Sequence, residues 1–125
     1  MKLPSQVTVV DVAPRDGLQN EHARITTAQK VMLVNLLSEA GVPVIETGAF
    51  VSAKWVPQMA DTAEVLADID RRPGTRYRVL VPNLRGLERA LAAGAREIAV
   101  LAAASETFSR RNINQSIDES FANYA

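Results

Sequence analysis

An arginine and an aspartate stand side by side directly after the first apolar stretch of the sequence. Residues 7–12 form a β-branched run that predicts a buried strand, and Ala13-Pro14 closes it. Arg15 and Asp16 then follow at the carboxyl end of that strand. A guanidinium there can stabilise an enolate oxygen, and a carboxylate can hold a divalent metal ion. An ion pair that caps a glycine turn explains the same two residues, and their spacing alone favours this simpler interpretation.

Glu46 is the second residue that could do chemistry, because it lies near the end of an apolar stretch from residue 42 to residue 47. In that place it can be a catalytic base, a support for a neighbouring group or an ion-pair partner. His22 is the only histidine, and its polar surroundings predict a solvated rather than a catalytic side chain. Phe50 and Trp55 follow in a long loop, where aromatic rings either line a substrate pocket or anchor the loop.

The elements that must position these residues alternate between strand and helix. We predict strands at residues 7–12, 42–47, 77–81 and 97–101, and helices at 26–40, 62–70, 83–93 and from 116 onwards. The spacing of apolar residues predicts which side of each of the first three helices faces the sheet. These inner faces are formed, in helix order, by Leu33, Leu36, Leu37 and Ala40; by Val65, Leu66 and Ile69; and by Leu84, Leu87 and Leu91. Repeated βαβ units predict parallel strands, so a doubly wound sheet and part of a (β/α)₈ barrel both fit. Both place the site at the carboxyl ends of the strands.

Composition narrows the class of protein. The chain has 125 residues, the size of one domain or of about half a (β/α)₈ barrel. Its 14 Lys and Arg balance 14 Asp and Glu, which argues against a nucleic-acid partner or an anionic membrane. No apolar run has the length of a membrane helix, and the absence of cysteine is compatible with a cytoplasmic location, which we expect.

The balanced charge hides a basic middle segment. Arg71, Arg72, Arg76 and Arg78 flank a predicted helix-to-strand turn at the end of the sheet opposite the site, and we expect them to be solvated. The pair Arg110-Arg111 follows the fourth strand at the site end, where it could bind an anionic ligand such as a nucleotide phosphate.

Several strings in this order resemble hydroxymethylglutaryl-CoA lyases. They are Ala13-Pro14-Arg15-Asp16-Gly17-Leu18-Gln19-Asn20-Glu21, Val44-Ile45-Glu46-Thr47, Phe50-Val51-Ser52-Ala53-Lys54-Trp55-Val56-Pro57-Gln58-Met59, Val81-Pro82-Asn83-Leu84 and Asn112-Ile113-Asn114. The resemblance implies an α/β fold, the N-terminal half of a (β/α)₈ TIM barrel, with residues 1–125 as a partial domain that stops in the fourth βα unit. It also implies a lyase of leucine breakdown and ketone-body formation, which cleaves 3-hydroxy-3-methylglutaryl-CoA to acetyl-CoA and acetoacetate.

The same resemblance implies roles for individual residues. Arg15 matches the arginine that stabilises the enolate of the leaving acetyl thioester, and Glu46 matches an acid that supports this arginine. Asp16 matches a ligand of Mg²⁺ or Mn²⁺. The positions expected to contact the acyl-CoA substrate are Arg15, Gln19, Asn112 and Ser116.

Other parts of the family's site are absent from this sequence. The resemblance assigns further metal ligands to a His-x-His pair and an asparagine, and a reactive cysteine to a Gly-rich loop, all on later strands. We therefore predict that the 125-residue chain alone is inactive. A related Claisen-type condensing enzyme, such as an isopropylmalate or homocitrate synthase, is one alternative. A non-catalytic half-barrel that self-associates through its open sheet edge is another, and a homo-oligomer fits either alternative.

Overall fold

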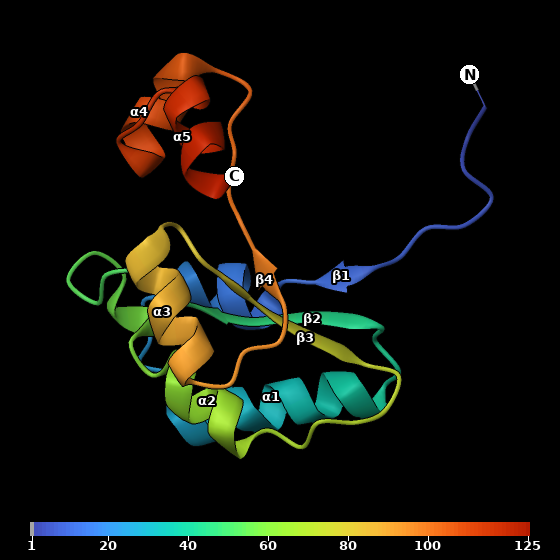
Figure 1. The fold of residues 1–125 in the computed structure, drawn as a ribbon. Coiled ribbons are helices and arrows are strands. Elements are labelled where there is room, and N and C mark those ends of the chain that lie inside the picture. The colour runs from blue at the N-terminus through green and yellow to red at the C-terminus, as the bar shows by residue number, and fades with distance from the viewer. Residues whose placement is uncertain (1) are drawn as a thin grey trace.

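The structure is a computed structural model that describes residues 2–125. Its strands are β1 (Val10–Asp11), β2 (Val44–Ala49), β3 (Arg76–Leu80) and β4 (Ile98–Ala99). Its helices are α1 (Thr27–Glu39), α2 (Thr62–Asp68), α3 (Leu84–Ala92), α4 (Glu106–Ile113) and α5 (Ile117–Tyr124), with a π-helical turn η1 (Ala13–Gly17) and a 3₁₀ turn η2 (Pro57–Met59). Figure 1 shows the alternation of strand and helix that the sequence predicts.

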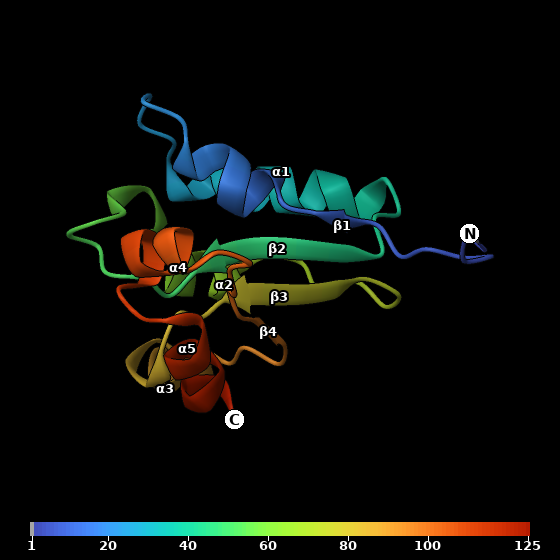
Figure 2. The same ribbon diagram turned by 90° about the horizontal axis from the view of Figure 1, so that it is seen from above.

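The four strands form one parallel sheet in the order β1-β2-β3-β4. This order confirms the predicted α/β class with about four parallel strands. The longest pairing joins β2 to β3, and its register shifts between Glu46 and Gly48. Helices α1 and α2 lie against one face of the sheet, as Figures 1 and 2 show.

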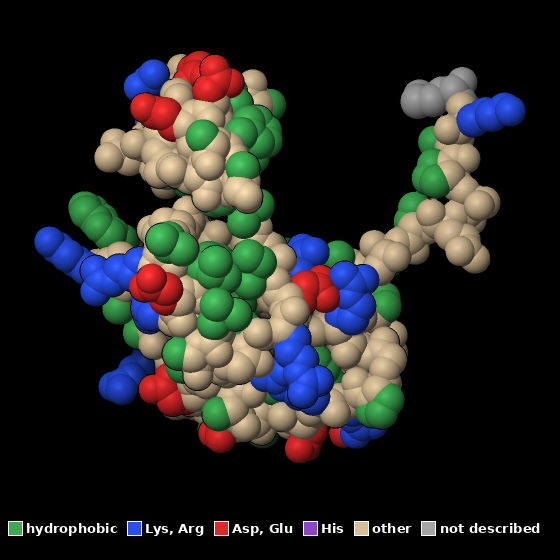
Figure 3. Space-filling view, viewed as in Figure 1, with side chains coloured by type: hydrophobic (Ala, Val, Ile, Leu, Met, Phe, Trp, Pro, Cys, Tyr) green, Lys and Arg blue, Asp and Glu red, His purple; other side chains and the backbone are tan. Residues whose placement is uncertain are grey.

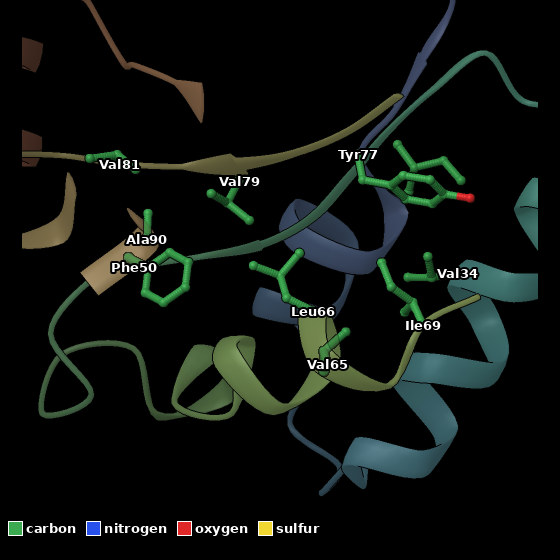
Figure 4. Close-up of a cluster of buried hydrophobic side chains, with 10 residues drawn as sticks. Val34, Phe50, Val65, Leu66, Ile69, Tyr77, Val79, Val81 and Ala90 are labelled. Carbon is green, nitrogen blue, oxygen red and sulfur yellow. The ribbon is translucent and has the colours of Figure 1, made fainter. Parts of the chain in front are cut away.

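The core fills the space between the sheet and these helices. Figure 4 shows its side chains converging from β2, β3, α1 and α2. The predicted inner face of α2, formed by Val65, Leu66 and Ile69, is confirmed, because all three side chains are buried there. Phe50 is buried in the same cluster and so anchors its loop, whereas Trp55 is 80% exposed.

The predicted stripe of α1 is partly wrong, although both ends of the helix agree with the prediction. Thr26 makes the capping box with Gln29, and Gly41 follows the helix with φ +83°. Leu36 nevertheless faces outward. The helix instead turns Lys30 and Ser38 inward, because Lys30 bonds to Asp61 and the Ser38 hydroxyl lies 2.9 Å from the Tyr77 hydroxyl.

The predicted stripe of α3 is also partly wrong, since of its three leucines only Leu87 packs against the core. Leu84 and Leu91 are exposed, and Gly86 and Ala90 face inward. A Cβ on Gly86 would lie 2.7 Å from the carbonyl oxygen of Phe50, so the helix packs closely through its smallest residues. The predicted cap is confirmed, since the Asn83 side chain accepts a hydrogen bond from the Gly86 amide.

The outer strands are shorter than the sequence predicts. Only Val10 and Asp11 of the apolar run at 7–12 pair with β2, and only Ile98 and Ala99 of the run at 97–101 pair with β3. Each of these strands has a neighbour on one side only, which leaves Val9 and Val100 exposed. In Figure 3 the N-terminal segment and the α4–α5 segment stand out from the body of the molecule, and charges of both signs are scattered over the visible face. Among residues 2–125, no helix is long and apolar enough to cross a membrane.

Candidate functional site

A π-helical turn directly after β1 positions Arg15 and Asp16. The carbonyl oxygen of Val12 accepts hydrogen bonds from the backbone amides of Arg15, Asp16 and Gly17, at 3.2, 2.7 and 3.2 Å. This turn brings the Arg15 side chain to Glu46 on β2 and leaves Asp16 beside it, mostly exposed. Single π-turns of this kind are frequent at functional sites. The predicted ion pair is present, with Arg15 Nη1 3.0 Å from Asp16 Oδ1.

Glu46 is the centre of the site. It is 2% exposed, and each of its carboxylate oxygens meets a different arginine. Oε1 accepts a hydrogen bond from Arg15 Nε at 2.6 Å, while Oε2 lies 3.0 Å from both Nε and Nη2 of Arg78. We refer to Arg15, Asp16, Glu46 and Arg78 as the arginine cluster.

This geometry bears on the three interpretations of Glu46 that the sequence leaves open, and it favours the ion-pair and supporting roles. A general base needs an oxygen that can reach the proton it removes. Both oxygens of Glu46 are engaged by guanidinium groups, and the carboxylate is shielded from solvent. Glu46 therefore supports Arg15, and the cap interpretation of Arg15 is incomplete because that arginine has a second, buried partner.

The expectation that Arg78 is solvated at the end opposite the site is wrong. Its side chain is 26% exposed and forms the ion pair with Glu46. Tyr77 and Val79 point into the core, so the alternation of β3 turns Arg78 to the opposite face, beside Glu46 in register on β2. An arginine inside an apolar strand indicates that the side chain has a charged partner, but only the register with β2 identifies that partner as Glu46.

The other arginines of the basic segment lie where the sequence predicts. Arg76 begins β3 and donates hydrogen bonds to Glu97 from Nε at 2.8 Å and from Nη2 at 2.7 Å. The bond from Arg76 holds the pKa of Glu97 below its ordinary value. Arg71 and Arg72 are exposed, and Arg72 pairs with Glu39.

The remaining predicted site residues do not join the arginine cluster through hydrogen bonds within residues 2–125. Asn112 lies on α4 and donates to the carbonyl oxygen of Phe108, and Ser116 caps α5 by accepting from the Glu119 amide. Gln19 is half-buried just beyond η1. His22 is exposed, as predicted, and both Arg110 and Arg111 are exposed in the last turn of α4.

Asp16 is the one predicted metal ligand, and its surroundings fit such a role. Its side chain is 56% exposed, and the hydrogen bond from Arg15 occupies Oδ1 only. A hard divalent cation takes six or more oxygen ligands, which include water. In the described part of the chain, no three acidic, histidine or cysteine side chains gather into a metal site. Asp16 can thus supply one ligand of such a site.

A second set of buried charges lies on the helix side of the sheet. Thr27, Lys30, Gln58 and Asp61 form what we call the lysine cluster. Lys30 Nζ donates to Asp61 Oδ1 and to the Gln58 carbonyl oxygen, and the Thr27 hydroxyl donates to Asp61 Oδ2 at 2.7 Å. Burial raises the pKa of Asp61, but the bonds from Lys30 and Thr27 outweigh it, so the pKa lies below its ordinary value.

Comparison with known proteins shows which family the chain resembles. The HMGL-like family model matches residues 6–125. The chain is 56% identical over 123 residues to the mitochondrial hydroxymethylglutaryl-CoA lyase of Mus musculus, covering 98% of this chain and 38% of that protein. It is 57% identical over 122 residues to the cytoplasmic 3-hydroxy-3-methylglutaryl-CoA lyase of Rattus norvegicus, covering 98% of this chain and 36% of the relative.

Solved structures agree with the sequence matches. The crystal structure of hydroxymethylglutaryl-CoA lyase from Pseudomonas aeruginosa has a TM-score of 0.91 and 57% identity, over 99% of this chain and 41% of that one. An HMG-CoA lyase from Acinetobacter baumannii, in complex with coenzyme A and 3-methylmalate, has a TM-score of 0.89 and 40% identity, over 99% and 41% of the two chains. The chain thus spans about two fifths of these relatives and has the fold of the N-terminal half of their barrel, and it belongs to the HMGL-like family.

Proposed function

We propose that this chain supplies the enolate-stabilising part of a hydroxymethylglutaryl-CoA lyase site. The observation that carries the proposal is the arginine cluster, in which buried Glu46 in the middle of β2 holds Arg15, just beyond the carboxyl end of β1, with Asp16 beside it. The relatives named above bear this activity, and one of them was solved with coenzyme A. The substrate of the proposed reaction is 3-hydroxy-3-methylglutaryl-CoA.

The proposed reaction breaks one carbon–carbon bond. The tertiary hydroxyl loses its proton, its carbon becomes the ketone of acetoacetate, and the bonding electron pair moves to the thioester carbonyl as an enolate. Protonation of the enolate carbon then gives acetyl-CoA. A positive group beside the thioester oxygen lowers the barrier, because negative charge develops on that oxygen only as the bond breaks.

Arg15 is the residue of this chain that fits the task. Its Nε bonds to Glu46 and its Nη1 bonds to Asp16, while Nη2 makes no hydrogen bond within the described residues. The guanidinium is therefore held from two sides and keeps a donor for the substrate. Asp16 would hold a divalent cation, which when bound would acidify the tertiary hydroxyl. Gln19, Asn112 and Ser116 remain the proposed substrate contacts.

The test needs the rest of the barrel. We define the completed barrel as a chimera of this chain followed by the remaining strands of the Pseudomonas aeruginosa lyase. We expect the completed barrel with added Mg²⁺ or Mn²⁺ to convert 3-hydroxy-3-methylglutaryl-CoA to acetyl-CoA and acetoacetate, measured by chromatography of the CoA esters. If the completed barrel instead condensed acetyl-CoA with a 2-oxo acid and did not cleave this substrate, the protein would be a related condensing enzyme and the proposal would be wrong.

The 125-residue chain by itself is the matched control. We expect it to form no acetyl-CoA, because Asp16 is the single metal ligand that it is proposed to contribute. We also propose that the protein is cytoplasmic. Mitochondrial and cytoplasmic relatives both exist, so fractionation of cells that express the complete gene decides the compartment.

A further inference from the structure

Arg78 has no place in the reaction as proposed so far, yet it is built into the centre of the site. It lies on β3 directly opposite Glu46 in the register of the sheet. Its Nε and Nη2 are both 3.0 Å from Glu46 Oε2. Both nitrogens of this forked contact meet the same oxygen, so Arg78 holds Oε2 while Arg15 holds Oε1, and the two arginines together set the orientation of the carboxylate.

The orientation of Glu46 decides the orientation of Arg15. Oε1 of Glu46 accepts the Arg15 Nε hydrogen bond at 2.6 Å, and this is the bond that ties Arg15 to the sheet. Without Arg78, Oε2 would be a buried carboxylate oxygen with no hydrogen-bond partner within the described residues. Such an oxygen is costly, so the carboxylate would rotate or shift until it found a partner, and Oε1 would move with it.

Arg78 also changes the charge that Arg15 presents. Without Arg78, the two carboxylates of Glu46 and Asp16 would stand against the single charge of Arg15, whereas with Arg78 the cluster has two positive and two negative groups. Arg15 therefore keeps more of its positive potential toward the substrate oxygen. The effect is electrostatic and acts at the moment when the enolate forms.

We propose that Arg78 is a positioning residue for the lyase reaction, acting through Glu46 to hold Arg15 toward the thioester oxygen. This inference rests on the proposed function. Arg78 does not contact the reacting atoms in this scheme. Its loss should therefore lower the rate of the chemical step more than it weakens substrate binding.

The experiment measures kcat and KM for Arg78→Leu in the completed barrel. We expect kcat to fall about tenfold or more, with KM within about twofold of the unmodified protein, because small misplacements of a catalytic group lower rates steeply. Arg78→Lys keeps the positive charge but loses the two-nitrogen contact with Glu46 Oε2. We therefore expect its kcat to lie between those of the unmodified protein and Arg78→Leu. Should Arg78→Leu fail to fold, Arg78→Lys carries the test by itself.

Arg76→Leu is the matched control. Arg76 precedes Arg78 by two residues on the same face of β3, and it too donates from Nε and Nη2 to a carboxylate, that of Glu97. We expect its kcat to remain within about twofold of the unmodified value, since the hydrogen bonds of Arg15 within residues 2–125 go to Glu46 and Asp16 and not to Glu97. If Arg76→Leu lowered kcat as much as Arg78→Leu does, the proposal would be overturned, because any ion pair on β3 would then be needed for activity.

A double variant tests whether Arg78 acts through Glu46. In a Glu46→Gln background, Arg78→Leu should change kcat by less than about twofold, because the group that it positions is already altered. Independent, multiplying losses would overturn the proposal, and so would a raised KM with unchanged kcat, which indicates direct substrate binding.

If the completed barrel without substitutions fails to cleave the substrate, the proposed function fails. If it cleaves and Arg78→Leu matches it, this inference fails alone.

Discussion

The arginine cluster and the lysine cluster are two ways of burying charge in one small sheet protein. In the lysine cluster, Asp61 has both oxygens occupied, one by Lys30 and one by Thr27. In the arginine cluster, Nη2 of Arg15 has no partner within the described residues, and Asp16 is mostly exposed. The first set is closed, and the second leaves a donor and a carboxylate oxygen available at the carboxyl ends of the strands.

This difference separates a structural role from a functional one. A closed set of hydrogen bonds ties two elements together and offers nothing to a ligand. The lysine cluster connects the start of α1 with the turn before α2 in this way. A set with open positions holds a group in place for a molecule that is yet to arrive. Substitutions in the two clusters should thus affect different measurements.

The largest effect should follow loss of the open donor. We expect Arg15→Gln in the completed barrel to lower kcat by about 10²–10³-fold, equivalent to roughly 3–4 kcal/mol of transition-state stabilisation. The thermal midpoint should also fall, because Oε1 of the buried Glu46 carboxylate loses its charged partner, but Arg78 still pairs with Oε2 and limits the loss. Steady-state kinetics and thermal unfolding of the same preparation measure both quantities. A large loss of stability with a normal kcat would reverse the contrast between the clusters.

Arg15, Asp16 and Glu46 could be predicted as site residues, because their positions relative to the apolar strands are visible in the local sequence. Arg15 and Asp16 follow the first predicted strand and Glu46 lies near the end of the second predicted strand, so the rule that sites form at strand ends brings them together, although β2 continues beyond Glu46 to Ala49. Arg78 was misplaced because it sits in the middle of β3, where only the register with β2 shows that it faces Glu46. That register depends on pairing between residues more than thirty positions apart, which no local pattern contains.

Loss of Lys30 should break the closed cluster. We expect Lys30→Met to lower the free energy of unfolding by about 2–3 kcal/mol, since Asp61 loses its charged partner while water still reaches part of its carboxylate. The kcat of correctly folded molecules should stay within about twofold. Denaturant unfolding and activity per folded molecule check these expectations.

Lys54→Met is the control for Lys30→Met. Lys54 is an exposed loop lysine, and its ammonium lies 5.8 Å from the centre of the Trp55 ring. We expect a change within about 0.5 kcal/mol, as for most surface substitutions. Equal losses in the two variants would show that burial of Lys30 contributes nothing.

Gly48 follows Glu46 by two residues on β2 and packs against Thr62, the neighbour of Asp61. A Cβ at this position would lie 2.6 Å from both Cγ2 and Oγ1 of Thr62. The Thr62 hydroxyl cannot move freely, since it donates to the Met59 carbonyl at 2.8 Å. We expect Gly48→Ala to cost about 1–2 kcal/mol in unfolding experiments.

Gly17→Ala provides the comparison for Gly48→Ala. The nearest atom to its new Cβ would be Ala13 Cβ at 3.7 Å, an ordinary contact. Gly17 does not have a positive φ, so alanine can take its backbone conformation. We expect unchanged or slightly raised stability. Similar losses for the two alanines would mean that close approach of β2 to α2 is not what requires Gly48.

The predicted helices show a second limit of local patterns. Leucine spacing placed Leu36 and Leu84 inward, yet both are exposed, because Lys30 and Gly86 decide how α1 and α3 face the sheet. A buried lysine and a glycine carry no hydrophobic signal. Their partners, Asp61 and the Phe50 carbonyl, lie far away in the sequence, so the orientation of each helix follows from tertiary contacts.

The smallest effect concerns acid. The folded-state pKa of Asp61 is lowered from 3.8, so its stabilising contribution is complete above about pH 4 and is lost as the pH falls through the lowered value. Lys30→Met removes one source of that lowering while burial, which raises the pKa, remains. The difference in unfolding free energy between the unmodified chain and Lys30→Met should therefore narrow from about pH 6 to about pH 3. Glu97, whose pKa is also lowered, titrates in both proteins and cancels. Denaturant unfolding at several pH values measures the difference, and one that widens in acid would show that the Lys30 ammonium does not act on the ionised Asp61 carboxylate.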